Sequence, residues 1–301
     1  MSSATLPATP HRGRVRAFLR LVAIEHSVFA LPFAYVAALT AMWREDRSVH
    51  WRELLLVTVA MVGARTFAMA ANRIIDRHID AQNPRTAQRE LVTGAVSLRT
   101  AWVGAVLALA VFLGAAALLN RLALALAPIA VVPLVLYPYA KRVTWAPHAV
   151  LALAQAVAPT GAWIAVTGQW SWTAVVLGLA VGTWIGGFDI IYALQDYAVD
   201  RRIGVRSLPA RFGPRVALRC SRAAHGVTVA LLLGFGALAG LGGVWYAGTL
   251  ATAVALGYEQ SLVRPDDLSR VNRAFFTVNG FVGIGLFGFA LVDLLLGGLR
   301  P

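Results

Sequence analysis

Long runs of hydrophobic residues recur along almost the whole chain and are separated by short polar segments. Nine of these runs are near the ~20 residues that an α-helix needs to cross the bilayer core. The apolar–polar alternation of membrane strands is absent from the sequence, and helices satisfy their own backbone hydrogen bonds in lipid. The pattern predicts an all-α integral membrane bundle with nine transmembrane helices near 21–43, 54–75, 100–118, 122–140, 147–167, 172–193, 217–240, 244–262 and 275–297.

Composition agrees with a membrane location. The 301 residues are 58% hydrophobic and 14% charged, whereas about a quarter of a soluble domain is charged. The arginines before the first apolar run resemble the start of a signal peptide, but the run from Leu21 to Trp43 is too long for one. We therefore interpret residues 1–301 as one transmembrane domain that begins with a basic segment, 1–20. The single Cys220 excludes an internal disulfide and fits no cysteine metal motif.

The net charge of +13 suggests either nucleic-acid binding or membrane orientation. If the N-terminus is cytoplasmic, strict alternation of the spans places 21 of the 27 Lys and Arg on the cytoplasmic side. Five lie on the other side, and Arg65 lies within the second span. Because cytoplasmic loops of membrane proteins collect Lys and Arg, this distribution favours orientation. It predicts a multi-pass protein of the inner (cytoplasmic) membrane that does not bind nucleic acid.

Two acidic motifs lie at the predicted cytoplasmic ends of the second and sixth spans. Asn72, Asp76 and Asp80 are four residues apart and share one stripe of a helix, and Asp196 and Asp200 repeat the spacing. Four carboxylates at one membrane face repel one another unless cations are present. Mg²⁺ takes carboxylate oxygens and leaves room for substrate phosphates. The motifs therefore predict a Mg²⁺ site between two facing helices, the alternative being solvated helix ends with local ion pairs.

Basic residues surround both motifs. Together with carboxylates and a metal, they provide what an anionic diphosphate requires. Two further ionisable groups lie deeper, Arg65 and Asp189, each seven residues before a motif and so on the same side of its helix. Charges within membrane spans are usually functional, and a structural ion pair is the alternative. The basic residues of the loops are Arg73, Arg77, Arg85, Arg89, Lys141, Arg142, Arg201, Arg202 and Arg206.

These segments resemble the UbiA family of membrane prenyltransferases over nearly the whole chain. The similarity covers 72–80 with Asn-Pro-Arg-Thr at 83–86, Tyr-Pro-Tyr-Ala-Lys-Arg-Val-Thr at 137–144, and 189–200 with its two aspartates. The resemblance implies a helical bundle around a central cavity. It also implies Mg²⁺-dependent transfer of a prenyl chain from a polyprenyl diphosphate to an aromatic ring.

The resemblance also assigns expected roles to individual residues. The metal ligands would be Asn72, Asp76, Asp80, Asp196 and Asp200. The substrate-binding residues would be Arg73, Arg77, Arg85, Lys141, Arg142 and Arg206. Of these, Arg77, Lys141 and Arg206 would hold the diphosphate. Lys141, Arg142 or Arg65 is the alternative partner of an acceptor carboxylate. The catalytic candidates would be Asp189, Tyr192 and Arg65, with Asp189 or the diphosphate itself accepting the ring proton.

The expected acceptor is 4-hydroxybenzoate, since the 4-hydroxybenzoate polyprenyltransferases of quinone biosynthesis are the most similar branch. Arg73 and Arg89-Glu90 depart from that branch and, with Glu25-His26, resemble a bacterial menaquinone sub-branch whose acceptor is 1,4-dihydroxy-6-naphthoate. Haem or a chlorophyllide is a third possible acceptor. A secondary transporter is the alternative of another class, but transporter sites usually lie near the bilayer midplane, whereas the acidic motifs lie at one face.

Overall fold

The structure is a computed structural model, and it describes residues 14–22 and 31–301. Helices make up nearly all of the regular structure in these ranges, since only two isolated β-bridges accompany them. The elements are α1 (Arg14–Leu21), α2 (Leu31–Glu45), α3 (Trp51–Asp80), α4 (Leu98–Leu119), α5 (Arg121–Val143), α6 (Pro147–Thr167), α7 (Trp172–Ala193), the 3-10 helix η2 (Leu194–Asp196), α8 (Tyr197–Ile203), α9 (Leu208–Ala239), α10 (Gly243–Leu262), the π-helical η3 (Arg273–Val278) and α11 (Asn279–Leu296).

The prediction of an all-α membrane protein is confirmed. Seven helices of the described ranges are long and apolar enough to span a bilayer: α3, α4, α5, α6, α7 together with η2 and α8, α9, and α11. The predicted span 244–262 coincides with α10, which is not among these seven. The predicted span 21–43 falls partly outside the described residues, and α2 covers its second part. The count of nine spans and the orientation of the N-terminus stay predictions.

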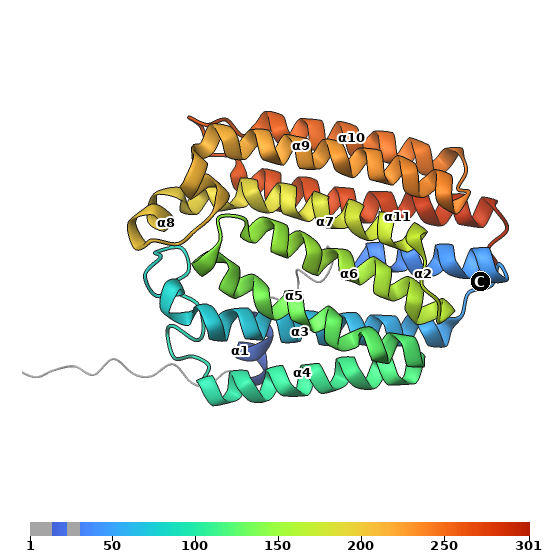
Figure 1. The fold of residues 1–301 in the computed structure, drawn as a ribbon, viewed down its shortest axis with the longest axis horizontal. Helices are drawn as coiled ribbons and strands as arrows, with labels where there is room; N and C mark the ends of the chain where they lie inside the picture. Colours follow the sequence, from blue (N-terminus) through green and yellow to red (C-terminus); the bar gives the residue numbers. More distant parts are fainter. Residues whose placement is uncertain (1–13, 23–30) are drawn as a thin grey trace, which may run out of the picture.

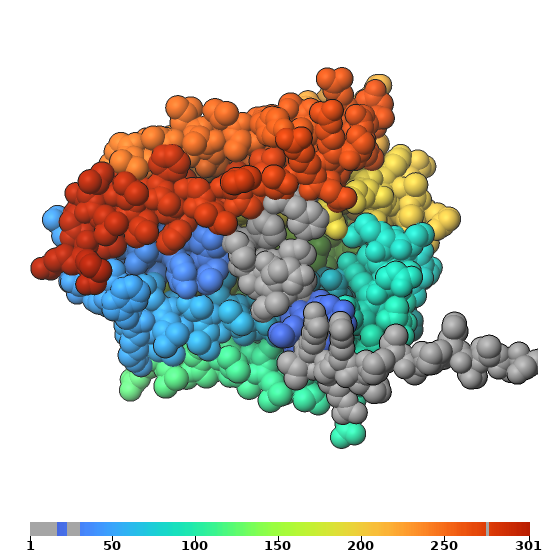
Figure 2. Space-filling view, turned by 180° about the vertical axis from the view of Figure 1, so that it is seen from behind, coloured from blue at the N-terminus to red at the C-terminus, as the bar shows by residue number. Residues whose placement is uncertain are grey.

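The long helices run roughly along one direction and form a bundle (Figure 1). Helix α7 packs against α6 on one side and α9 on the other, and α3 packs against α4 and α5. Seen from behind, α2 lies between α11 and α3 (Figure 2). Helix α8, the 81–97 segment and the start of α9 all lie at one end of the bundle (Figure 1). Both acidic motifs therefore reach the same end, as the alternation of spans predicts.

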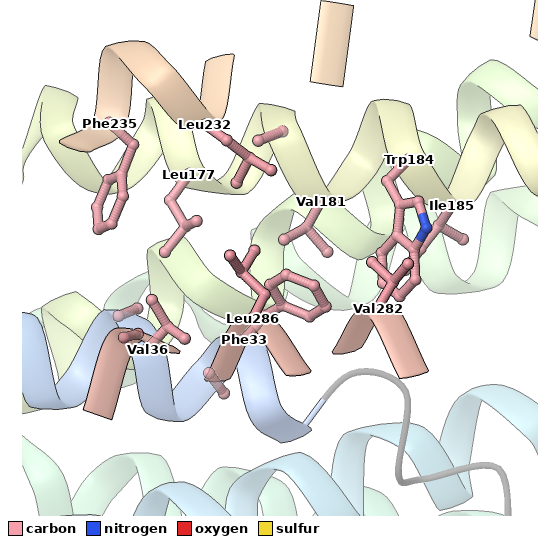
Figure 3. Packing of buried hydrophobic residues seen from close by; sticks show 14 of the residues in the cluster. Phe33, Val36, Leu177, Val181, Trp184, Ile185, Leu232, Phe235, Val282 and Leu286 are labelled. Atoms are coloured by element: carbon pink, nitrogen blue, oxygen red, sulfur yellow. The ribbon is translucent and has the colours of Figure 1, made fainter. Parts of the chain in front are cut away.

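The main hydrophobic core surrounds α7. Trp184 and Phe33 stack with ring centroids 4.9 Å apart, and Val181, Leu232 and Leu286 lie in the same cluster (Figure 3). Because lipid tails are as apolar as these side chains, close van der Waals packing, and not removal from water, holds such helices together in a bilayer. The packing fixes α7, the helix that leads directly into the second acidic motif in η2 and α8.

Small residues bring α6 and α7 unusually close together. A Cβ atom at Gly178 would lie 2.4 Å from the Ala156 carbonyl oxygen, and one at Gly182 would lie 2.4 Å from the Ala152 carbonyl oxygen. These distances are too short for any side chain, so the glycines allow the backbones to touch. Such small-residue contacts are a common way for membrane helices to associate. They fix the start of α6 relative to the end of α7.

Candidate active site

The first acidic motif occupies the last two turns of α3. Asp76 is fully buried and Asp80 is 4% exposed, and Asn72 lies one turn earlier on the same stripe and is half-buried. Helix α3 continues without interruption to Asp80. The predicted alignment of the three side chains along one face of a helix is therefore confirmed by the geometry of α3.

Two basic residues from the end of α5 neutralise Asp76. Lys141 Nζ lies 2.5 Å from Asp76 Oδ2, and Arg142 Nη2 lies 3.3 Å from Oδ1. Arg142 also donates hydrogen bonds to the carbonyl oxygens of Ile75, at 2.7 Å, and Pro138, at 3.1 Å. A buried carboxylate is costly unless it is paired, so these contacts explain how Asp76 is tolerated inside the protein.

The loop that follows α3 binds the second motif. Arg85 donates from Nε to Asp196 Oδ1 at 2.9 Å and from Nη2 to Oδ2 at 2.5 Å, and the Asn83 amide donates to the same carboxylate at 2.8 Å. Arg85 also donates from Nη1 to the Tyr192 hydroxyl at 2.9 Å. Burial lowers the pKa of Arg85, but its hydrogen bond to Asp196 and the charge of that carboxylate outweigh burial, and the pKa is raised. Arg85 therefore stays charged and joins the two motifs.

The remaining two aspartates also have partners. Arg89 donates to Asp80 Oδ1 at 2.6 Å, and the Ser207 hydroxyl donates to Asp200 Oδ2 at 3.1 Å. Arg206 donates from its backbone N–H to the Lys141 carbonyl oxygen at 2.8 Å and from Nη1 to the Val143 carbonyl oxygen at 2.7 Å. These bonds hold the loop before α9 against the end of α5. The structure thus gathers both motifs, the 81–97 loop and the end of α5 into one charged site.

Two of the predicted substrate-binding arginines are in none of the ion pairs that the described residues form with these acids. Arg77 donates to the ring of its neighbour His78 at 3.1 Å and lines an apolar groove of about 360 Å³ with Phe67 and Trp102. Phe67 precedes Asp76 by nine residues and so lies on the opposite side of α3. Arg73 donates from Nε to the Leu21 carbonyl oxygen at 3.3 Å. Arg73 lies within electrostatic reach of Asp80, whereas Arg77 lines the groove, and the role of both in substrate binding stays a prediction.

Deeper in the bundle, the two candidate groups differ in their surroundings. Arg65 is half-buried on α3, two turns before Asn72. Asp189 on α7 is paired with His148 at the start of α6, with Oδ2 and Nδ1 2.6 Å apart. Nothing in the sequence pattern singles out His148, because its partner is 41 residues away. Asn83 was visible in the motif at 83–86, but only the fold shows that it binds Asp196.

The donor set is chemically suited to Mg²⁺. Carboxylates and amide oxygens from Asp76, Asp80, Asp196, Asp200 and Asn72 are the hard oxygen ligands that this ion prefers. Within residues 14–22 and 31–301, however, no three His, Cys, Asp or Glu side chains converge closely enough to hold a metal ion. Lys141, Arg142, Arg85 and Arg89 pair with the aspartates instead. The residue types fit the metal, and side-chain cations balance the acids in this arrangement.

Comparisons with known proteins find relatives that match this chain over most of its length. The sequence model of the UbiA prenyltransferase family matches residues 30–281, which include both motifs. A 4-hydroxybenzoate octaprenyltransferase of Alkalilimnicola ehrlichii is 33% identical over 86% of this chain and 88% of its own length. One of Azotobacter vinelandii is 30% identical over 93% of this chain and 92% of its own length.

Solved structures show the same fold. The apo structure of a UbiA homolog from Aeropyrum pernix K1 superposes with a TM-score of 0.81 at 38% identity, over 90% of this chain and 98% of that one. A UbiA homolog from Archaeoglobus fulgidus bound to DMAPP and Mg²⁺ gives a TM-score of 0.70 at 20% identity, over 93% of this chain and 99% of that one. The second similarity concerns the fold alone.

Proposed function

This chain belongs to the UbiA prenyltransferase family, and on that premise we propose that it transfers a polyprenyl chain from a polyprenyl diphosphate to a hydroxylated aromatic acid. The expected acceptor is 4-hydroxybenzoate, on which the names of the relatives agree. The observation that carries the proposal is that both acidic motifs lie at one end of the bundle, paired there with Arg85, Arg89 and Lys141. A transporter is disfavoured because this site lies at an end of the helices and not halfway along them.

In this proposal, the acidic residues of the site bind the metal, and the basic residues bind the diphosphate. Asp76, Asp80, Asp196 and Asp200, with Asn72, would hold Mg²⁺, which neutralises the charge that develops on a leaving diphosphate. Arg85 and Arg89 belong to the 81–97 loop and Lys141 to the end of α5, so all three reach the acids from outside the α3 and α7 helices. Their N–H groups would donate to diphosphate oxygens, and such charge-assisted bonds are strong.

In the proposed transfer step, one bond of the donor breaks and one carbon–carbon bond forms. The bond between the allylic carbon and the diphosphate oxygen breaks, and its electron pair leaves with the diphosphate. A ring carbon of the acceptor forms the new carbon–carbon bond, and the proton on that ring carbon passes to Asp189. Water must be excluded because it would capture the allylic cation, and the surrounding bundle provides that exclusion.

Arg65 and Arg142 are the proposed partners of the acceptor carboxylate. A carboxylate gains a charge-assisted bond to arginine, worth roughly 1.5–3 kcal/mol or about ten- to a hundredfold in affinity. Arg65→Leu should raise the apparent KM for the acceptor by that factor and change the KM for the donor less. An effect confined to the donor would assign Arg65 to the diphosphate.

The proposal has two forms, which differ in the aromatic ring of the acceptor acid. The departures at Arg73 and at Arg89-Glu90 favour 1,4-dihydroxy-6-naphthoate as the alternative acid. Purified protein should be given a prenyl diphosphate, Mg²⁺ and each acid separately, with haem and a chlorophyllide as further acceptors. If only one of the acids gives product, that acid is the acceptor. If none of these compounds gives product, the proposed function is refuted.

The metal is tested in the same assay. Asp196→Asn removes one charge from the second motif and should abolish transfer, while Asp46→Asn, in the loop before α3, should not change it. Full turnover of the Asp196 variant, or of wild-type protein in excess EDTA, would contradict metal-dependent catalysis at these residues.

We further propose nine spans, with α10 and the segment ending in α2 added to the seven apolar helices, and a cytoplasmic N-terminus in the inner membrane. The distribution of Lys and Arg supports this topology. In a Cys220→Ser background, cysteines placed at Gln88 and Gln169 should react with an impermeant reagent from opposite sides. Labelling of both from the same side would show that the span count is wrong.

A further inference from the structure

A buried histidine lies directly behind the carboxylate to which the ring proton is assigned. His148 Nδ1 and Asp189 Oδ2 are 2.6 Å apart, which is a short hydrogen bond. The side chain of His148 is 6% exposed, whereas that of Asp189 is 16% exposed. Of the two side chains, the carboxylate is therefore the one that reaches open space.

The position of His148 is set by the contact between two helices. His148 is the second residue of α6, and a Cβ atom at Gly186 of α7 would lie 3.2 Å from the His148 carbonyl oxygen. One turn earlier, Gly182 allows a closer approach to Ala152. Because both glycines precede Asp189 on α7, the close packing of the helices fixes the imidazole against the carboxylate. Small displacements of α6 would break the bond.

Asp189 is also connected to the diphosphate site. Tyr192 follows it by one helical turn and accepts the hydrogen bond from Arg85. On α5, the phenol of Tyr137 lies within electrostatic reach of both Asp189 and Asp76. The carboxylate thus lies beside the charged groups that are proposed to hold the donor, which is where a base for the ring proton must be.

The two nitrogen atoms of the imidazole have different surroundings. Nδ1 contacts the carboxylate, whereas Nε2 is buried and has no hydrogen-bond partner in the described residues. An ionised carboxylate only accepts hydrogen bonds, so the proton of the pair belongs on Nδ1. Since the pair uses Asp189 Oδ2, the other oxygen, Oδ1, remains available to a proton from the substrate.

We propose that His148 is a positioning residue for the transfer reaction, donating Nδ1–H to Asp189 Oδ2 so that Oδ1 is held ready to accept the ring proton. The proposal rests on the proposed function. In the step, the bond between the ring carbon and its hydrogen breaks, its electron pair restores the aromatic ring, and the proton forms a bond to Oδ1. His148 keeps its own proton throughout. A donated hydrogen bond stabilises the charged carboxylate and restricts its rotation.

Three variants separate positioning from folding. His148→Phe keeps the ring and removes the donor, and His148→Asn places an amide N–H near the position of Nδ1. His225→Asn is the matched control, because His225 is equally buried on the other side of α7 but contacts Gln260. Each variant is assayed for kcat, for both KM values, and for the isotope effect with an acceptor deuterated at the ring position that is prenylated.

We expect His148→Phe to lower kcat about ten- to a hundredfold, which is no more than the lower end of general-base contributions because Asp189 itself remains, with little change in either KM. The isotope effect should rise, because proton removal becomes the slow step. His148→Asn should recover most of kcat, and the His225 variant should leave the isotope effect unchanged. An unchanged kcat and isotope effect in His148→Phe would overturn the proposal, as would loss of folding in both His148 variants. If wild-type protein prenylates no acceptor, the proposed function fails first, which is a different result.

Discussion

Replacing Lys141 by Met tests the charge balance of the site. Asp76 is fully buried, and the ammonium of Lys141 lies 2.5 Å from its Oδ2. Methionine keeps most of the side-chain length and removes the charge. Removing one partner of a buried ion pair costs about 3–5 kcal/mol because the other charge is left uncompensated. Arg142 remains 3.3 Å from Oδ1, so we expect a loss at the lower end of this range, about 3 kcal/mol.

The second part of the prediction concerns Mg²⁺. If Asp76 is a metal ligand, the ion does not have to displace an ammonium group in the Lys141 variant. Mg²⁺ should therefore raise the unfolding temperature of Lys141→Met by more than that of wild-type protein, since at a fixed concentration a ligand stabilises the folded state more when its affinity for that state is higher. Tryptophan fluorescence of detergent-solubilised protein during heating measures both effects, with and without EDTA.

Two further variants complete the test. In Lys141→Met with Asp76→Asn, neither charge is present, and the double variant should be more stable than Lys141→Met alone, because the carboxylate is no longer left uncompensated. Asp293→Asn is the control for destabilisation without a metal ligand. The reasoning is refuted if Lys141→Met is as stable as wild-type protein, or if Mg²⁺ stabilises all variants equally.

The remaining predictions concern Arg85, Asp293 and the metal. Arg85→Lys loses the bidentate hydrogen bonding to Asp196 and should raise the KM for the donor about tenfold or more. The control variant Arg99→Lys, in the first turn of α4, should leave this KM unchanged. Asp293 accepts hydrogen bonds from three backbone N–H groups at the start of α10, so Asp293→Asn should lower the free energy of unfolding by about 1–2 kcal/mol without changing kcat. Titration calorimetry should find that Mg²⁺ binds more tightly when inorganic diphosphate is present, and equal affinities would contradict this.

Much of the fold follows from local features of the sequence. The length of an apolar run is enough to predict a spanning helix, and a spacing of four residues is enough to align Asn72, Asp76 and Asp80. Counting spans predicts that both motifs lie on the same side of the membrane, and the structure places them at one end of the bundle (Figure 1). These are properties of single helices and of their alternation, so they need no knowledge of how helices pack.

The pairing of charges is not local. Arg85 binds an aspartate 111 residues away, and His148 binds one 41 residues away. Arg77 shows, conversely, that a residue next to an aspartate in the sequence need not contact that aspartate. It is adjacent in sequence to Asp76, but neighbouring residues on a helix point about 100° apart, and its guanidinium lines a groove away from the acids. Which cation meets which carboxylate depends on the packing of α3, α5, α6 and α7, which the sequence pattern does not specify.

The ion pairs also explain how so acidic a site exists at a membrane face. Each motif brings carboxylates into a largely buried setting, where unpaired charges are strongly disfavoured. The chain supplies its own cations from Lys141 and from the 81–97 loop, so the helices can pack before any metal or substrate arrives. On the proposed function, these same cations would compete with a metal for the carboxylates and would gain an alternative partner when a diphosphate binds. The diphosphate should then strengthen the binding of the metal, and by thermodynamic linkage the metal would strengthen the binding of the diphosphate by the same factor. The arrangement therefore favours joint binding of both over binding of either one alone.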